Sequence, residues 1–579
     1  MRSVLAATAA AIAIAATATL SSQSKPGAPT TRTLRRGVDT APKFSVVEAS
    51  IPEMQRAMRE GRVTSRQLVE QYLMRIALYE EKLNATLWVN AKALAEADAL
   101  DRERRAGKVR GPLHGIPVAL KDNVHTTDMP TTGGAIAFEG LMVPYEATLT
   151  KNLREAGAVI IAKTTMTELA NFVANGMPGN YNALAGYAMN PYDPRRDPRT
   201  ATADGRPVLG TGGSSSGVGT AANFWAANVG TETSGSILSP ANANMLAAIK
   251  PTVGRISRYG VIPITADQDT AGPMAKTVSD VAIMFGALEG ASPDPNDPAT
   301  KTCQPPPNRD YTPFLKGGAL KGARIGIPRA NFYDKITLPG DKEPRGGLSD
   351  AQAKVMAEAI EILKKHGATV IDADIPSVVD KDTDNNFLLW GGSCGKGPRE
   401  PNCSSVLWYG MKRDFNLWLA SLGAAAPVKT LAELREFNTK HSNRNAIKYG
   451  QANLDRSDEL DLEKDRAKWE ADRKKDIQLA ATHGIDEVMK AQRLDALFFP
   501  GAGSAGIAAK PGYPTVIVPF ALVPPAPPTN APFPDGFTPA PAPFGVSFTG
   551  MACSEPRLIE LAYAFEQATK RRVPPPSAP

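Results

Sequence analysis

Two short stretches rich in glycine and serine carry the residue types best suited to chemistry in this chain. The first runs from Gly210 to Gly219 and the second from Gly230 to Ile237. Small residues leave backbone N–H groups open to a ligand, as an anion or oxyanion site requires. A serine in such a stretch can also act as a nucleophile when a base lies nearby. The two stretches are therefore the first candidates for an active site.

A lysine at the end of an apolar segment is a candidate base for such a serine. Lys121 directly follows Gly115–Leu120, a run typical of a buried β-strand. Burial at a strand end lowers the pKa of a lysine, so its amino group can be neutral near pH 7 and accept a proton. On spacing alone, plain loops and a solvated lysine are the commoner explanation of these residues.

A second interpretation takes a histidine as the base. Residues Gly213–Gly217 fit the G-x-S-x-G pattern of serine hydrolases, with Ser215 as the nucleophile. Only His366, His441 and His483 follow this point in the sequence. His366 and His483 precede glycines at expected helix ends, where a cation is favoured without any catalytic role. This alternative therefore depends on His441.

Nucleotide and metal sites lack their usual patterns here. No lysine follows the glycines as a phosphate-binding loop needs, and the first stretch matches G-x-G-x-x-G only loosely. The chain has no H-E-x-x-H or C-x-x-C motif and no cluster of His and Asp at metal-ligand spacing. We therefore expect no metal and no cofactor.

Composition and charge exclude several classes of protein. The chain has 579 residues, of which 42% are hydrophobic and 22% are charged, and this excludes wholesale disorder. Lysine and arginine number 66 against 59 aspartates and glutamates, so the net charge is only +7. Because the charges are interspersed, nucleic acid is not an expected partner. The 49 glycines and 49 prolines indicate many loops or a few long ones.

Buried-strand patterns alternate with helical patterns along the chain, which predicts an α/β fold. Ser50 begins a capping box before a helical region that extends to about Arg110. Further strands are expected at residues 159–162, 324–328, 368–371, 494–499, 515–518 and 545–548, and further helices at 351–366 and 555–570. Residues 380–490 are polar and helical, which favours an inserted cap layer. Residues 291–314 and 519–544 are expected to be loops, because proline is rare inside sheets.

The first residues fit a secretory signal. Arg2 precedes the apolar run Val4–Leu20, and Ala16-Thr17-Ala18 resembles a signal-peptidase site. The alternative is a buried or membrane-anchoring helix, but the run is short for a span. We expect a signal peptide at residues 1–24, a flexible segment at 25–47 and export to the periplasm or the medium.

Four cysteines are too few for a disulfide scaffold. Export would permit disulfides, and Cys394 and Cys403 lie close enough in a loop-like stretch to pair. Two free thiols fit equally well.

In their order along the chain, these stretches resemble the amidase signature family. The resemblance rests on Gly115–Asn123, the Gly-Gly-Ser-Ser-Ser-Gly run, Gly230–Pro240, Ile249–Thr252, Gln268–Met274, Gly512–Pro514, Pro543–Gly545 and the helix around Phe565. It covers about residues 48–572 and is strongest toward stand-alone bacterial amidases and peptide amidases. It implies a single large α/β/α sandwich with a mixed central β-sheet flanked by helices. Beyond it, we expect the proline-rich residues 573–579 to form a disordered tail.

The resemblance also implies a role for each matching residue. Lys121 matches the catalytic lysine, Ser214 the bridging serine that follows a cis peptide bond in the family, and Ser236 the nucleophile. Backbone N–H groups of four residues match the oxyanion hole: Thr233, Ser234, Gly235 and Ser236. The implied reaction is hydrolysis of a carboxylic or peptide C-terminal amide through an acyl-enzyme.

Another role within the family is that of the amidotransferase subunit that supplies ammonia for tRNA-linked amidation. Leu238 stands where that subunit has arginine, and export is at odds with cytoplasmic tRNA chemistry. The interval from Ser214 to Ser236 is also slightly shorter than is usual in the family. We expect a small-molecule or peptide amide as the substrate, no membrane insertion after signal removal, and a monomer or homodimer.

Overall fold

The computed structural model describes residues 44–199, 204–213, 216–390, 397, 399–524 and 532–579. The signal-peptide prediction, most of the expected flexible segment, Ser214, Ser215 and Cys394 lie outside these residues. Within the described ranges, no helix combines the length and the apolar character needed to cross a membrane.

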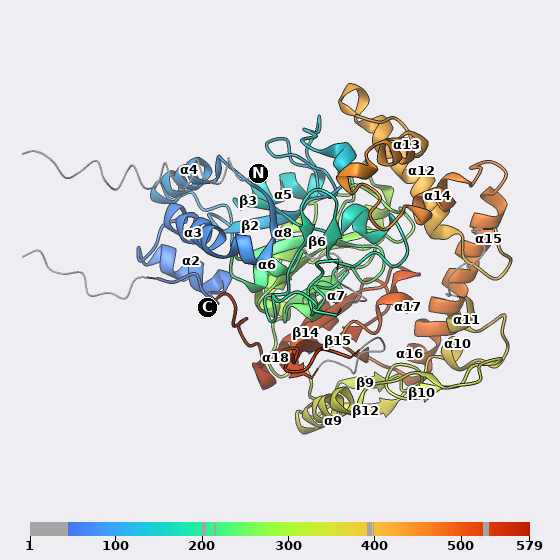
Figure 1. Cartoon of the computed structure of the whole chain (residues 1–579). Coiled ribbons are helices and arrows are strands. Elements are labelled where there is room, and N and C mark those ends of the chain that lie inside the picture. Colours follow the sequence, from blue (N-terminus) through green and yellow to red (C-terminus); the bar gives the residue numbers. More distant parts are fainter. Residues whose placement is uncertain (1–43, 200–203, 214–215, 391–396, 398, 525–531) are drawn as a thin grey trace, which may run out of the picture.

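A mixed 11-stranded sheet runs through the molecule (Figure 1). Its strands lie in the order β1 (Thr86–Val89), β3 (Val159–Thr164), β2 (Pro117–Lys121), β6 (Ala227–Glu232), β8 (Thr270–Ala275), β7 (Ala247–Lys250), β14 (Thr515–Val523), β15 (Ala542–Thr549), β13 (Ala496–Pro500), β9 (Arg324–Ile327) and β12 (Thr369–Asp372). Strand β2 is parallel to both β3 and β6. The carboxyl ends of β2 and β6 therefore meet at one edge of the sheet.

Helices flank this sheet, as the resemblance implies. The larger are α2 (Ile51–Arg59), α3 (Ser65–Leu83), α4 (Ala93–Arg105), α5 (Thr148–Glu155), α8 (Val278–Leu288), α9 (Asp350–Lys365) and α18 (Glu555–Thr569), with the short α6 (Val218–Ala221), α7 (Leu238–Ala243) and α17 (Ala505–Ala509). Helix α2 begins with the predicted capping box between Ser50 and Glu53. The predicted helices at 351–366 and 555–570 are confirmed within one residue at each end.

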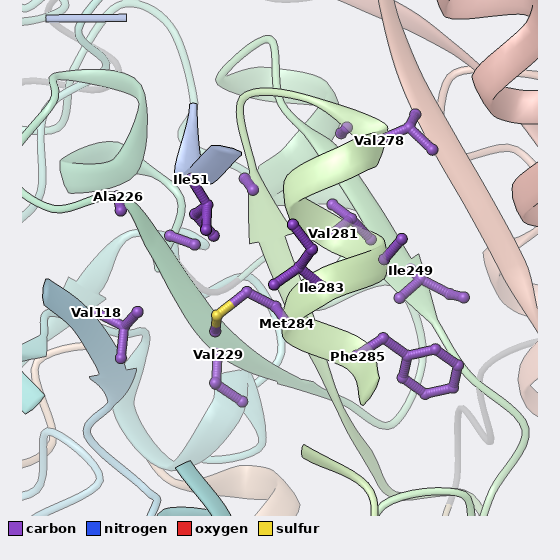
Figure 2. Packing of buried hydrophobic residues seen from close by; sticks show 14 of the residues in the cluster. Ile51, Val118, Ala226, Val229, Ile249, Val278, Val281, Ile283, Met284 and Phe285 are labelled. Carbon is purple, nitrogen blue, oxygen red and sulfur yellow. The ribbon is translucent and has the colours of Figure 1, made fainter. Parts of the chain in front are cut away.

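Alternate residues of the central strands enter different hydrophobic clusters. Val516 and Val518 of β14 join the large cluster that includes α8 and α18, whereas Ile517 between them packs with Leu238 and Ala241 of α7. Figure 2 shows Val281, Met284 and Phe285 of α8 among the buried residues of the large cluster. Because strand side chains alternate between the two faces, both faces of the sheet are covered.

The region that follows β12 forms a helical cap. It contains α10 (Pro376–Val379), α11 (Phe387–Trp390), α12 (Val406–Ser421), α13 (Leu431–Lys440), α14 (Ala452–Asp458), α15 (Arg466–Ile477) and α16 (Asp486–Gln492). Phe415 and Trp418 of α12 pack against Phe138, which lies in the segment between β2 and β3. The cap therefore covers loops at the end of the sheet where β2 and β6 finish.

The proline-rich loop is shorter than expected, because β14 continues to Val523 and β15 begins at Ala542. Beyond Ile517, β14 pairs among the described residues only with β15, so this part of the strand continues as one half of a two-stranded ribbon. The register shifts after Pro519. Proline is tolerated at a bulge or on an open strand edge, which explains why these residues form strand.

The expected disordered tail is instead packed against the domain. Arg75 of α3 donates hydrogen bonds to the carbonyls of Ala578 and Pro579 at 2.7 and 2.9 Å. Ala578 is fully buried. The expected flexible segment also ends earlier than predicted, since Val46 is buried and its N–H donates to Gln71. Both predictions were wrong there because Arg75 meets the opposite end of the chain and Val46 meets a helix that comes later in the sequence, so neither contact leaves a local pattern.

A disulfide joins Cys303 to Cys553 across 250 residues of sequence. It links the proline-rich loop after α8 to the turn before α18, a pairing that no local pattern in the sequence indicates. Cys403 is also disulfide-bonded, which excludes two free thiols as the state of the Cys394 and Cys403 pair.

Candidate active site

Lys121 ends strand β2 with its side chain fully buried. Its Nζ donates to the Thr231 carbonyl at 3.1 Å and to Thr231 Oγ1 at 2.8 Å. Burial lowers the pKa of Lys121 to about 7, although the carboxylates of Asp269 and Glu232 act in the opposite direction. The amino group is thus held by neutral oxygens and can lose its proton near neutral pH.

Thr231 is a part of this site that sequence reasoning missed. It lies on β6, and the parallel register pairs Leu120 with Val229, so Thr231 falls beside the end of β2. Its Oγ1 also accepts from Asn123 Nδ2 at 3.0 Å. The hydroxyl therefore anchors Lys121 at the end of β2 and Asn123 just after it. The strand register identifies this role, because the sequence does not distinguish Thr231 from Thr233, the other threonine of its motif.

The turn after β6 presents Ser236. The Glu232 carboxylate accepts from the N–H groups of Ile237 and Leu238 at 2.7 and 3.0 Å, which closes the turn at the start of α7. Gly235 has φ 87°, a conformation that favours glycine. Ser236 is 8% exposed, so its hydroxyl lies at the floor of the turn rather than in bulk solvent.

The two glycine-serine stretches pack against each other. A Cβ atom placed on Gly213 would lie 3.6 Å from Ser236 Oγ. Gly213 N–H donates to Ser239 Oγ at 3.2 Å, and its carbonyl accepts from Thr167 Oγ1 at 3.2 Å. Gly212 lies so close to Pro240 that a Cβ would approach the Pro240 nitrogen to 2.3 Å. Gly213, where the described part of the first stretch ends, therefore lies directly beside the Ser236 hydroxyl.

The other end of the turn is held by a loop before β8. Thr233 Oγ1 donates to Asp269, and the Thr233 carbonyl accepts from Gln268 Nε2 at 3.2 Å. Asp269 also accepts from the N–H groups of Ile264 and Thr265. Burial raises the pKa of Asp269 to about 6. Both Gln268 and Asp269 lie in the motif that carried the resemblance, but nothing in the sequence assigned them this role.

Two backbone donors in the turn point to a binding function. In the described part of the chain, neither the Ser234 N–H nor the Gly235 N–H donates a hydrogen bond. The Ser234 side chain is exposed, so the turn borders solvent on this side. Open N–H groups next to a serine hydroxyl form the arrangement that stabilises an oxyanion.

Comparison with known proteins shows the family of this chain. The Amidase family model matches residues 67–559. The chain belongs to the amidase family. A probable amidase of Arabidopsis thaliana is 33% identical over 540 residues, and the match covers 92% of each chain. A glutamyl-tRNA(Gln) amidotransferase subunit of Rhodopirellula baltica is 34% identical, but over only 56% of this chain and 59% of its own length.

Solved structures of amidases are similar over nearly the whole chain. The native peptide amidase from Stenotrophomonas maltophilia is 34% identical with a TM-score of 0.74, and the match covers 91% of this amidase and 98% of that chain. An amidase family protein from Bacillus anthracis is 30% identical with a TM-score of 0.74, and the match covers 92% of each chain. The chain is therefore an amidase signature enzyme that is similar to peptide amidase.

The three histidines that follow Ser215 in this amidase have structural contacts outside the candidate site. His441 Nδ1 lies 2.8 Å from the Phe437 carbonyl, and its ring stacks on Phe437 at 3.9 Å, at the end of α13. His366 caps the end of α9, as predicted. His483 lies 2.9 Å from both Asp380 and Glu487. The contacts of His441 hold its ring on its own helix, and Ser215, its partner in the alternative mechanism, lies outside the described residues.

A cavity of about 890 Å³ lies in the cap beside α15. Trp469, Arg473, Asp380, His483 and Glu487 contribute to its wall, whereas none of the predicted site residues does. Three of its titratable groups already bond to one another, because His483 bridges Asp380 and Glu487. A smaller cavity of about 280 Å³ reaches the first glycine stretch at Gly210.

Proposed function

We propose that this amidase hydrolyses carboxamides, including the C-terminal amides of peptides, to a carboxylate and ammonia. The observation that carries the proposal is Lys121: a fully buried lysine whose amino group contacts the oxygens of a neutral residue, Thr231, one strand away from the turn that bears Ser236. The similarity to the Stenotrophomonas maltophilia peptide amidase supports the substrate class.

In the proposed mechanism, neutral Lys121 accepts a proton from Ser214, which in turn accepts the proton of Ser236. Ser236 Oγ attacks the amide carbon, and the carbonyl electron pair moves to the oxygen. The N–H groups of the Thr233–Ser236 turn bind this oxyanion. In serine hydrolases the loss of one such donor costs about 3 kcal/mol of transition-state stabilisation.

The tetrahedral species then collapses and breaks the carbon–nitrogen bond. Ser214 returns a proton to the leaving nitrogen and is itself reprotonated by Lys121, so the first half-reaction ends with a neutral lysine. Water attacks the acyl ester by the same route, and Ser236 leaves as an alcohol. Each proton that is removed from a nucleophile is delivered to a leaving group, so neither a metal nor a cofactor is needed.

The test is ammonia release from a peptide amide by the purified chain, without partner or ATP. Ser236→Ala is expected to lose a factor on the order of 10⁴ or more in kcat. Ser547→Ala is the matched control, because Ser547 is fully buried in β15 and, within the described chain, its hydroxyl has no hydrogen-bond partner. Hydroxylamine added to the wild type is expected to divert the acyl group to a hydroxamate. Retention of activity by Ser236→Ala, or the absence of hydroxamate, would refute the mechanism.

We also propose that the amidase is exported, as its N-terminal sequence indicates. Disulfides form and persist in oxidising compartments, so the bond between Cys303 and Cys553 supports export. The test is the mass of the protein recovered from the periplasm or medium of a bacterial host, where loss of about residues 1–24 is expected. Uncleaved protein in the cytoplasm would contradict this.

A further inference from the structure

Cap helices α12 and α15 hold the short loop before β8 through Asp267. Its carboxylate accepts from Trp469 Nε1 at 3.0 Å and from Arg413 at 3.2 Å, and its carbonyl accepts from Arg473 at 3.0 Å. Trp469 is itself fixed, since it stacks on Tyr409 with ring centroids 5.1 Å apart. Three cap side chains therefore converge on one residue of the core.

Helix α12 also touches this loop directly. Asp414 accepts from the Ala266 N–H at 2.7 Å. A Cβ atom placed on Gly410 would lie 2.1 Å from Thr265 Oγ1, so the helix backbone and the loop are in close contact. The loop between Thr265 and Asp269 thus contacts the cap at three successive residues, Thr265, Ala266 and Asp267.

The next residue of the loop, Gln268, reaches the catalytic turn. The side-chain Nε2 of Gln268 donates to the Thr233 carbonyl, and the residue is 1% exposed. In a planar trans peptide the C=O and the following N–H point in opposite directions. The hydrogen bond from Gln268 to the Thr233 carbonyl therefore also sets the direction of the Ser234 N–H, one of the open donors of the turn.

We propose that Trp469 and Arg473 of the cap are positioning residues for the oxyanion hole. They fix Asp267, the adjacent Gln268 fixes the Thr233–Ser234 peptide, and the Ser234 N–H is thereby aimed at the reacting oxygen. The inference rests on the proposed function, because it assigns a source of order to the same turn. If these residues position the turn, the turnover rate of this amidase depends on contacts of helix α15, which takes no part in the proton transfers.

The test compares two indole-to-carboxylate hydrogen bonds in the cap. Trp469→Phe removes the donor to Asp267, whereas Trp390→Phe removes a donor to Asp476, 2.8 Å away, that does not touch the loop. Trp469→Phe is expected to lower kcat about tenfold with KM changed less than about twofold, as the loss of a hydrogen bond to a charged group allows. Trp390→Phe is expected to leave both constants near the wild-type values.

Inhibition by a peptide aldehyde gives a readout that general destabilisation would not move. An aldehyde adds the Ser236 oxygen to form a tetrahedral oxyanion, whereas the corresponding alcohol binds without this group. The Ki of the aldehyde is expected to rise about tenfold in Trp469→Phe, in parallel with kcat, while the Ki of the alcohol stays constant. Gln268→Ala is expected to act on the same path, so the double variant should lose little more than Gln268→Ala alone.

Two failures are distinguishable. If Ser236→Ala remained active, the proposed function itself would be refuted. If Ser236 proved essential but Trp469→Phe and Trp390→Phe behaved alike in kcat and in aldehyde affinity, only the positioning role would be wrong. Additive losses in the double variant would equally overturn it.

Discussion

The burial of Lys121 leads to a quantitative prediction about pH. Only the neutral amine can accept a proton, so kcat/KM depends on the fraction of Lys121 that is deprotonated. With the pKa lowered from 10.5 to about 7, roughly half of the enzyme holds a neutral lysine at pH 7. A solvated lysine would be neutral in only about 3 molecules in 10⁴ at the same pH. Burial of this one side chain thus increases the active fraction by a factor on the order of 10³.

The assay is ammonia release from a peptide amide between about pH 5.5 and pH 9.5, at substrate concentrations below KM. We expect kcat/KM to rise about tenfold per pH unit below an apparent pKa of about 7 and to level off above it. Lys121→Met has a side chain of similar length without a titratable group. Its kcat/KM is expected to be lower by a factor on the order of 10³ or more and not to rise with pH in this way.

Added primary amines supply a further check. A small amine that enters the space left by Lys121→Ala is expected to restore part of the activity, and the restored rate should follow the concentration of the neutral amine. A wild-type profile that is flat across this range, or a Lys121→Met variant with more than a few per cent of wild-type activity, would refute the assignment of Lys121 as the base. Loss of activity in His441→Ala with Lys121→Met unimpaired would favour the histidine mechanism instead.

The remaining predictions concern the surroundings of the site and the framework. Thr231→Val removes the oxygen that Lys121 and Asn123 share and is expected to lower kcat about tenfold or more with little change in KM, as steady-state kinetics would show. At pH 7, Lys121→Met should unfold at a higher urea concentration than the wild type, because Lys121 binds a proton more strongly in the unfolded chain than in the folded one. This difference in stability should shrink as the pH rises from about 7 toward 10.5. A difference that stays constant over this range would contradict the link between the pKa of Lys121 and stability. Replacement of Cys303 and Cys553 by serine opens a loop of 250 residues, and the chain-entropy account gives a loss of roughly 5 kcal/mol in the free energy of unfolding, measured by urea titration with the reduced wild type as the control. Deletion of residues 573–579 removes buried Ala578 and the two tail carbonyls that accept from Arg75, while the bonds of Arg75 to the Ala222 carbonyl remain, so the midpoint of thermal unfolding should fall. The midpoint of a full-length Ser577→Ala control, which loses a single hydrogen bond to Pro191, should fall less.

Features with a local signature could be predicted from the sequence. The capping box at Ser50, the buried strand before Lys121 and the end of α9 at His366 all follow from patterns within a few residues. The glycine-serine stretches were recognisable for the same reason, since small residues in a row have few structural explanations. The sequence by itself therefore determined the α/β alternation and indicated the candidate residues for chemistry.

The tertiary structure decided how those residues meet. Lys121 bonds to Thr231 because β2 and β6 are parallel neighbours in a particular register, and a register between strands 110 residues apart is not encoded in either strand. The disulfide, the packed tail and the contact of Trp469 with Asp267 likewise join segments that are distant in sequence. Each depends on groups that the tertiary structure brings together from distant parts of the chain. Local patterns report the propensity of a segment, whereas partners across the molecule are selected by packing.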